Sequence, residues 1–132
     1  MAKYVFPAIF VKEDNGSYSV DFPDVPGCFT CGNDLEHAVE MAEDALALML
    51  FHYECEGRPI PAATELSDIR PEGGAFASLV RCDTIGYQKR HNNRAVKKTL
   101  TIPEWLNEAA SERGVNFSQV LQEGLLSKHG IE

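Results

Sequence analysis

The sequence lacks long hydrophobic runs: none of its 132 residues lie in a stretch that approaches the ~20 apolar residues of a membrane-spanning helix. Its first residues, Met1-Ala2-Lys3-Tyr4, also lack the apolar core and small-residue cleavage site of a signal peptide. These absences predict a cytoplasmic protein whose four cysteines are reduced thiols. Repeats and low-complexity tracts are absent too, and the hydrophobic content of 44% is typical of one globular domain, or of a small domain plus a smaller module.

Patterns for catalysis and metal binding are also scarce. No Ser-His-Asp arrangement and no glycine-rich phosphate loop is present. The four histidines are isolated and expected at the surface: His37, His52, His91 and His129. Cys28-x-x-Cys31 has the spacing of a zinc or redox motif, but residues three apart on a strand face opposite sides, and Cys55 and Cys82 supply no second pair. We therefore expect no metal site and no cofactor.

Charge is divided unevenly along the chain. The net charge is −8, yet residues 1–88 hold five Lys/Arg against fifteen Asp/Glu, a net −10. Residues 89–132 hold seven against five, a net +2. A polyanionic partner is therefore compatible only with the C-terminal end of the chain.

The N-terminal residues predict three strands. Tyr4–Lys12 is rich in aromatic and β-branched residues, and Asn15-Gly16 suits a tight turn. Apolar and polar residues alternate from Tyr18 to Phe22, which indicates a strand with one buried face and completes a hairpin. Cys28–Gly32 is expected to form a short third strand.

A helix follows these strands, with its N-cap at Asn33 or Asp34. Asn33 and Glu36 have the spacing of a capping box, and Gly57 and Pro59 are expected to end the helix. One stripe of the helix is apolar at helical spacing: Leu35, Ala38, Val39, Ala42, Ala45, Leu46, Met49 and Tyr53. Additional apolar residues near the C-terminal end indicate either a second packing contact or a partner surface: Leu48, Leu50 and Phe51.

The segment after the helix predicts a loop, a strand and a linker. Residues 58–75 are rich in proline and glycine, and Phe76–Cys82 is expected to form a fourth strand. The order β-β-β-α-β predicts an α+β fold in which one helix packs on a small sheet. Residues 84–94 are polar and basic without periodicity, so they are interpreted as a linker.

The remaining residues predict one strand and two helices, a β-α-α module. Lys97–Ile102 alternates, Pro103 opens a helix that Gly114 ends, and Asn116 with Gln119 has the spacing of a second capping box. About 40 residues of this kind cannot bury a sufficient core alone, and the single strand has no neighbour to pair with. Two copies that pair their strands across a two-fold axis satisfy both needs, so we predict an obligate dimer.

Alternation along the predicted strand assigns its two faces. The residues expected in the dimer core are Leu100, Ile102, Trp105 and Leu121. The outward residues have hydroxyls and an ammonium that suit base edges in the DNA major groove: Lys97, Thr99 and Thr101. The residues expected to contact phosphates are Arg94, Lys98 and, at the start of the last helix, Asn116, Phe117 and Ser118. Lys89 and Arg90 would add salt-dependent contacts.

Residues 97–104, Lys-Lys-Thr-Leu-Thr-Ile-Pro-Glu, together with the Gly114 break and the capped last helix, resemble a ribbon-helix-helix DNA-binding module. Lys98 departs from the pattern, because many relatives place an inward apolar residue there, and it indicates an exposed start of the strand. The alternative is a dimerisation module that contacts no DNA, since Thr and Lys are common on any exposed strand.

A second resemblance covers residues 18–38. The alternating Tyr18-x-Val20-x-Phe22, the Pro-Asp-Val-Pro-Gly of residues 23–27 and the Asp-Leu-Glu-x-Ala of residues 34–38 are similar to the signature of HicB-type antitoxins. Asp34 stands where Thr or Ser is frequent and still supplies an N-cap oxygen. The resemblance implies three parts: a truncated RNase H-like toxin-binding domain over residues 1–83, a basic linker over 84–94 and a ribbon-helix-helix domain over 95–132.

The resemblance also implies a function. HicB-type antitoxins bind and block a small HicA-type toxin that cleaves RNA, and they repress their own operon by binding operator DNA. The net charge of −10 in residues 1–88 agrees, because a toxin that handles RNA needs a basic surface. Solubility is the other explanation for this charge, although it requires far less.

Two other functions remain as alternatives: a stand-alone ribbon-helix-helix regulator without a toxin partner, and a weak metal-dependent nuclease. Two-metal cleavage needs clustered carboxylates, one of them on the first central strand, and Tyr4–Lys12 contains no Asp or Glu. Asp21 and Asp24 lie at a strand end and in a turn, where solvated or capping roles are commoner. We expect no catalytic residue and no enzymatic activity.

Overall fold

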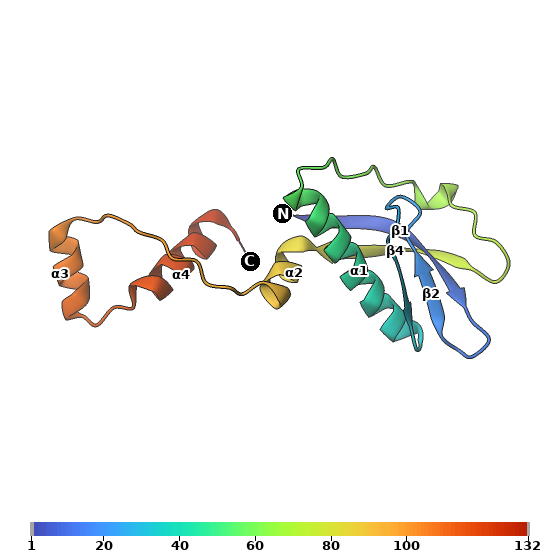
Figure 1. Cartoon of the computed structure of the whole chain (residues 1–132), viewed down its shortest axis with the longest axis horizontal. Coiled ribbons are helices and arrows are strands. Elements are labelled where there is room, and N and C mark those ends of the chain that lie inside the picture. Colours follow the sequence, from blue (N-terminus) through green and yellow to red (C-terminus); the bar gives the residue numbers. More distant parts are fainter. Residues whose placement is uncertain (1, 132) are drawn as a thin grey trace. The chain divides into compact units, whose positions relative to one another are not determined.

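The computed structural model of the chain describes residues 2–131, which fall into two units divided between Asn93 and Arg94. The first unit, blue to yellow in Figure 1, contains a four-stranded sheet, helices α1 and α2 and one short 3₁₀ turn. The second unit, orange to red, contains helices α3 and α4. The chain therefore has a mixed α and β architecture.

The sheet is antiparallel throughout. Its strands are β1 (Lys3–Lys12), β2 (Tyr18–Asp21), β3 (Phe29–Gly32) and β4 (Phe76–Asp83), in the order β3-β2-β1-β4. The predicted hairpin joins β1 to β2, and its turn places Gly16 at a φ of 88°, a backbone conformation that favours glycine. β1 and β2 are therefore central, whereas β3 and β4 form the two edges.

Helix α1 (Leu35–Cys55) covers one face of the sheet. Alternate side chains of β1 point toward it, and Phe6, Ala8 and Phe10 are all buried. The buried residues of α1 are Ala38, Ala42, Leu46, Ala47, Leu50 and Tyr53. The apolar C-terminal end of α1 is thus partly core, because Leu50 is fully buried, whereas Leu48 is 38% exposed.

The start of α1 differs in detail from the sequence prediction. The N-cap is Asp34, whose Oδ1 accepts a hydrogen bond from the backbone N–H of His37 at 2.8 Å. The expected capping box of Asn33 and Glu36 is wrong, because the side chain that reaches back to Asn33 N–H is His37, through Nδ1 at 2.9 Å. An imidazole nitrogen can accept this hydrogen bond as a carboxylate does. The usual preference for Glu in a capping box therefore pointed to Glu36 instead of His37.

Residues 56–75 connect α1 to β4 and are held against the sheet unit at several points. Ile60 packs against the core, and the carboxylate of Asp24 accepts hydrogen bonds from the backbone N–H and the hydroxyl of Thr64 at 2.8 and 2.6 Å. The 3₁₀ turn η1 (Leu66–Asp68) lies near β4. Asp24 therefore has a structural role that joins the β2–β3 turn to this long connection.

The predicted linker begins with a helix, so its interpretation as irregular over residues 84–91 is wrong. Helix α2 (Thr84–His91) is capped by Asp83, whose Oδ1 accepts from Ile85 N–H at 3.0 Å. The ring of Tyr87 packs on Phe51 of α1 with ring centroids 5.6 Å apart. An isolated helix of eight residues is unstable in water. The apolar side chains at the C-terminal end of α1 therefore supply the surface on which α2 packs.

A polar anchor fixes α2 at its first residue. Thr84 is fully buried; its hydroxyl accepts from Ala2 N–H at 2.8 Å and lies 3.2 Å from Glu54 Oε2. The Tyr4 hydroxyl donates to the same carboxylate oxygen at 2.7 Å. Burial, with Glu54 as the next cause, raises the pKa of Tyr4 to about 12. The N-terminus, α1, β4 and α2 therefore meet at this anchor.

The second unit contains α3 (Glu104–Glu112) and α4 (Phe117–His129), and none of its described residues is buried. The predicted strand Lys97–Ile102 is not formed in the single chain, because residues 92–103 belong to no helix or strand. A strand requires a hydrogen-bonded neighbour, and the sequence analysis placed that neighbour on a second copy.

Gly32→Ala is expected to destabilise the first unit strongly. A Cβ built on Gly32 would overlap the backbone nitrogen and Cα of Ala38, because α1 passes directly over the end of β3. Because backbone atoms cannot move aside as a flexible side chain can, we expect the free energy of unfolding to fall by about 1–3 kcal/mol. Urea unfolding measures this, and Gly74→Ala, where a Cβ meets nothing within 4 Å, is the matched control. Equal stability of the two variants would contradict the packing described.

Candidate DNA-binding and partner-binding surfaces

The residues predicted to read DNA lie together in the segment before α3. Lys97, Thr99 and Thr101 are all exposed. The side chains predicted for the dimer core are exposed as well in the single chain: Leu100, Ile102, Trp105 and Leu121, with Trp105 at 69%. The second unit therefore presents both sets to solvent.

The start of α4 carries the other predicted DNA contacts. Asn116 is the N-cap, and its Oδ1 accepts from Gln119 N–H at 3.1 Å. Gln119 does not complete a capping box, because its side chain instead donates to Glu123 Oε1 at 3.1 Å. The backbone N–H groups of Phe117 and Ser118 belong to the first helical turn, which no intrahelical carbonyl can satisfy. They remain suited to an anion, whereas the Asn116 side chain is already engaged. The remaining predicted phosphate contacts, Arg94 and Lys98, are exposed in the preceding segment.

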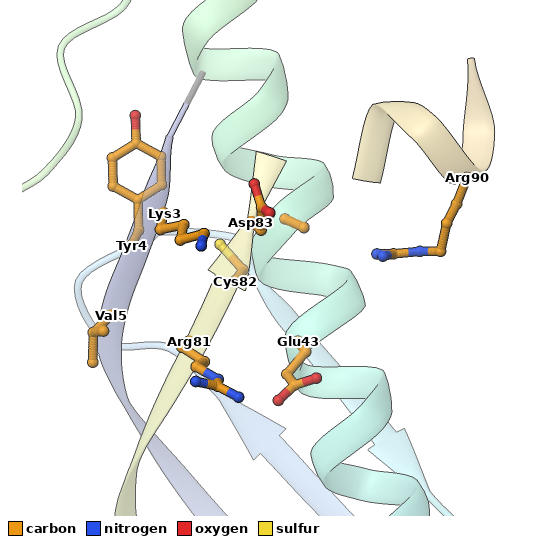
Figure 2. A pocket seen from close by; sticks show the side chains of 9 residues that line it. Lys3, Tyr4, Val5, Glu43, Arg81, Cys82, Asp83 and Arg90 are labelled. Atoms are coloured by element: carbon orange, nitrogen blue, oxygen red, sulfur yellow. The ribbon is translucent and has the colours of Figure 1, made fainter. Parts of the chain in front are cut away.

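A cavity of about 540 Å³ lies beside β4 in the first unit. Three cationic side chains line it from three elements: Lys3 on β1, Arg81 on β4 and Arg90 on α2. Figure 2 shows Arg81 on the side of the cavity that Glu43 faces, and Arg90 extending from α2 toward Asp83. Sequence reasoning missed this grouping, because Lys3 is far from Arg81 and Arg90 in the chain and the three meet only through the fold.

The face of the sheet opposite α1 carries exposed apolar side chains. Phe29 on β3 is 72% exposed, and it pairs with Asp21 of β2, which in turn pairs with Ile9 of β1. Leu79 and Val5 are also exposed on this face. The solvent side of α1 differs, because it carries Glu36, Glu40, Glu43 and Asp44, and α1 contains no Lys or Arg. The first unit thus offers an apolar surface and an acidic one.

The carboxylates of the first unit do not form a metal site. Asp24 bonds to Thr64, and Asp21 lies exposed on β2. Across residues 2–131, no three His, Cys, Asp or Glu side chains gather closely enough to hold a metal ion. His91, expected to be isolated, instead lies 3.6 Å from Asp44 and packs on Tyr87 with ring centroids 4.5 Å apart.

The cysteines separate into two classes, although strand alternation does not apply to the first pair, because Cys28 lies just before β3. Cys28 and Cys82 are buried, whereas Cys31 and Cys55 are exposed, and all four are free thiols. Burial, with Asp21 as the next cause, raises the pKa of the Cys28 thiol to about 11. Burial, followed by the charges of Asp83 and Glu54, raises the pKa of Cys82 to about 12. Cys28 and Cys31 therefore lie in different environments, one buried and one exposed.

Comparison with known proteins places these surfaces in context. A family model described as the HicB-like antitoxin of bacterial toxin–antitoxin systems matches residues 6–124. The chain belongs to the HicB-like antitoxin family. The match extends across both units, so the first unit and most of the second are covered by one family.

Individual relatives agree with the family. Antitoxin HicB 1 of Photorhabdus laumondii is 38% identical over 56 residues, which are 42% of this chain and 36% of that antitoxin, so the match spans little more than a third of the relative. A chain in the toxin–antitoxin complex from Streptococcus pneumoniae has 24% identity and a TM-score of 0.62, with 96% of this chain and 99% of that chain covered. A chain in a HicA3 and HicB3 toxin–antitoxin complex has 26% identity and a TM-score of 0.51, with 61% and 99% covered. The S. pneumoniae likeness shows the fold alone.

The helices of this HicB-like antitoxin are not membrane spans: within residues 2–131, none is both long and apolar enough to cross a bilayer. The features that the sequence analysis missed are α2 and the cationic cavity. Asp83 followed by Thr84 was an available N-cap signal for α2, but the cavity has no signal in the sequence because it depends on how β1, β4 and α2 pack.

Thiol labelling distinguishes the two classes of cysteine. At pH 8 we expect two thiols, Cys31 and Cys55, to react rapidly with a thiol reagent in the folded protein, because they are exposed. Cys28 and Cys82 are expected to react slowly, since burial and raised pKa values keep them protonated and inaccessible. Mass spectrometry identifies the labelled residues, and Cys31→Ser should reduce the rapid class to one. Rapid labelling of all four would contradict the buried positions.

Proposed function

We propose that this HicB-like antitoxin neutralises a HicA-type, RNA-cleaving toxin by direct binding through its first unit. We further propose that it represses its own operon as a dimer whose second units bind operator DNA. The observation that carries the DNA-binding half is the exposure of every predicted dimer-core side chain in a unit none of whose described residues is buried. A unit of this size without a core requires a partner to complete it, and a second copy also supplies the missing strand neighbour.

The proposed dimer has a ribbon-helix-helix arrangement over residues 95–132. In it, Lys97–Ile102 of the two copies pair as antiparallel strands, and Leu100 and Ile102 face the helices. Lys97, Thr99 and Thr101 then point away from the helices toward the DNA major groove, which admits a two-stranded ribbon. The first turn of α4 lies at a position from which its N–H groups can bind a phosphate.

The toxin-binding half is supported by charge and by the comparisons. The first unit contains seven Lys/Arg and fifteen Asp/Glu, a net −8, which complements a protein that handles RNA. The HicA3 and HicB3 complex contains a chain similar to 61% of this chain, more than residues 94–132 alone supply. A truncated RNase H-like arrangement is proposed for this unit, extended by α2, which replaces part of the expected linker.

Leu121→Glu is expected to prevent dimer formation. Leu121 is exposed in the single chain and would be buried between two copies, where an unpaired carboxylate is strongly unfavourable. Sedimentation velocity should therefore report a monomer for the variant and a dimer for the parent protein. Glu108→Gln, a change at an exposed residue of α3 outside the predicted core, serves as the control. A monomeric parent protein with α3 and α4 folded would overturn the proposed dimer.

Thr99→Ala combined with Thr101→Ala is expected to abolish selectivity for operator DNA and to leave toxin binding unchanged. The two hydroxyls are the proposed base-edge contacts, and they lie outside the unit proposed to bind toxin. Lys97→Ala is expected to weaken operator binding by about 1–3 kcal/mol if it reads a base edge, and only to reduce the salt dependence if it contacts a phosphate. Lys128→Ala, which removes the same charge at the end of α4, is the matched control.

Fluorescence anisotropy with operator and scrambled duplexes measures selectivity for DNA. Calorimetry with a HicA-type toxin measures toxin binding. DNA binding without toxin binding would instead favour a stand-alone regulator. Unchanged operator selectivity in the double variant would refute the assignment of the ribbon.

A further inference from the structure

The cationic cavity is unusual for the unit that contains it. The first unit has only seven Lys/Arg against fifteen Asp/Glu, yet three of the seven line this one cavity. They come from β1, β4 and α2, so the fold rather than the local sequence brings them together. Such a grouping in an acidic unit is a local positive site, because charge within about 8–10 Å dominates over more distant charge at physiological salt.

The two acidic side chains in the lining do not fully offset these cations. The carboxylate of Asp83 already accepts from Ile85 N–H at the N-cap of α2, where the positive end of the helix balances part of its charge. Glu43 lies on α1 across from Arg81. Arg81 and Arg90 are exposed and end in guanidinium groups, which bind phosphate oxygens with two parallel hydrogen bonds.

The number of residues between Arg90 and Lys97 limits the distance between the cavity and the proposed DNA contacts. Arg90 lies in the last turn of α2, one residue before the helix ends at His91. From His91 to Lys97 the chain has six residue steps, which span at most about 22 Å when fully extended. The end of α2 therefore stays within about 22 Å of the residue Lys97 that is proposed to contact the duplex.

From this group of cations and the short connection between Arg90 and Lys97, we infer that the cavity lined by Lys3, Arg81 and Arg90 binds a phosphate of the DNA backbone beside the operator. The inference rests on the DNA binding proposed above and adds a second, sequence-independent contact made by the first unit. Its physical role is to offset the repulsion between an acidic unit and the phosphates that lie near it. Bases carry no negative charge, so the contact would change affinity and salt dependence without changing selectivity.

The test removes two of the charges without removing the ability to donate hydrogen bonds. Arg81→Gln combined with Arg90→Gln is compared with Lys12→Gln combined with Arg70→Gln, which removes the same net charge from exposed positions outside the cavity. A third protein, Arg81→Lys with Arg90→Lys, retains the charges. Urea unfolding and toxin calorimetry of all three establish that the first unit is intact.

The measured quantity is the slope of log K against log salt concentration for an operator duplex with flanking base pairs. The cavity variant is expected to lower the magnitude of the slope by about 0.9 for each phosphate that the cavity no longer neutralises, with unchanged preference for operator over scrambled DNA. The lysine variant is expected to keep the parent slope. Trimming the flanking base pairs should remove the difference between the cavity variant and the parent protein.

Other outcomes overturn the inference. Equal slopes in the cavity and control variants would mean that the change in salt dependence comes from the net charge of the protein and not from the cavity. Loss of inorganic phosphate or single-stranded RNA binding in the cavity variant, with an unchanged DNA slope, would assign the cavity to those ligands instead. If the parent protein binds no DNA selectively, both the proposed repression and this contact are wrong. If the parent protein binds operator DNA selectively and the cavity variant has an unchanged slope, only the proposed phosphate contact is wrong.

Discussion

The packing of α1 across one face of the sheet is the contact on which the first unit depends. Small side chains make it close: Ala38 and Ala42 are fully buried, and Gly32 leaves space for the backbone of Ala38. The close approach brings the large residues Phe10, Leu46 and Leu50 into one core, where they are shielded from water. Because α1 covers only one face, the exposed side chains of the other face, Phe29, Leu79 and Val5, remain available to partners.

A second consequence of this packing lies at the C-terminal end of α1. There the helix passes close to the start of β1 and the end of β4, so that Glu54 receives hydrogen bonds from Tyr4 and Thr84. The same end presents Phe51, on which α2 packs. Polar and apolar contacts thus act together to hold a short helix that local preference alone would not stabilise.

The sequence predicted the elements whose residues repeat with a clear period. Aromatic and β-branched content located β1, alternation located β2, and the apolar stripe at helical spacing located α1. The sequence did not locate α2, because a helix of eight residues with Ile85 and Tyr87 as its main apolar residues is too short to show a period. The helix is stabilised instead by packing on Phe51, which lies far away in the sequence. The capping box failed for a different reason, since a histidine performed the role expected of a glutamate.

The candidate sites divide in the same way. The predicted DNA contacts Lys97, Thr99 and Thr101 follow from alternation along one expected strand and could be proposed from sequence. Lys3, Arg81 and Arg90 could not, because nothing in their local sequence indicates that β1, β4 and α2 converge. Residues that act through one element are accessible to sequence reasoning, whereas residues that meet through packing require the fold.

The anchored start of α2 determines where the first unit can be separated from the rest of the chain. A fragment that stops at Asp83 would lack the threonine hydroxyl that binds Ala2 and lies beside Glu54. It would also expose the ring of Phe51, on which Tyr87 packs, to water, where it would favour aggregation. Domain boundaries drawn from composition alone would cut there, and an expression fragment that ends after Asn92 keeps the helix and its contacts intact.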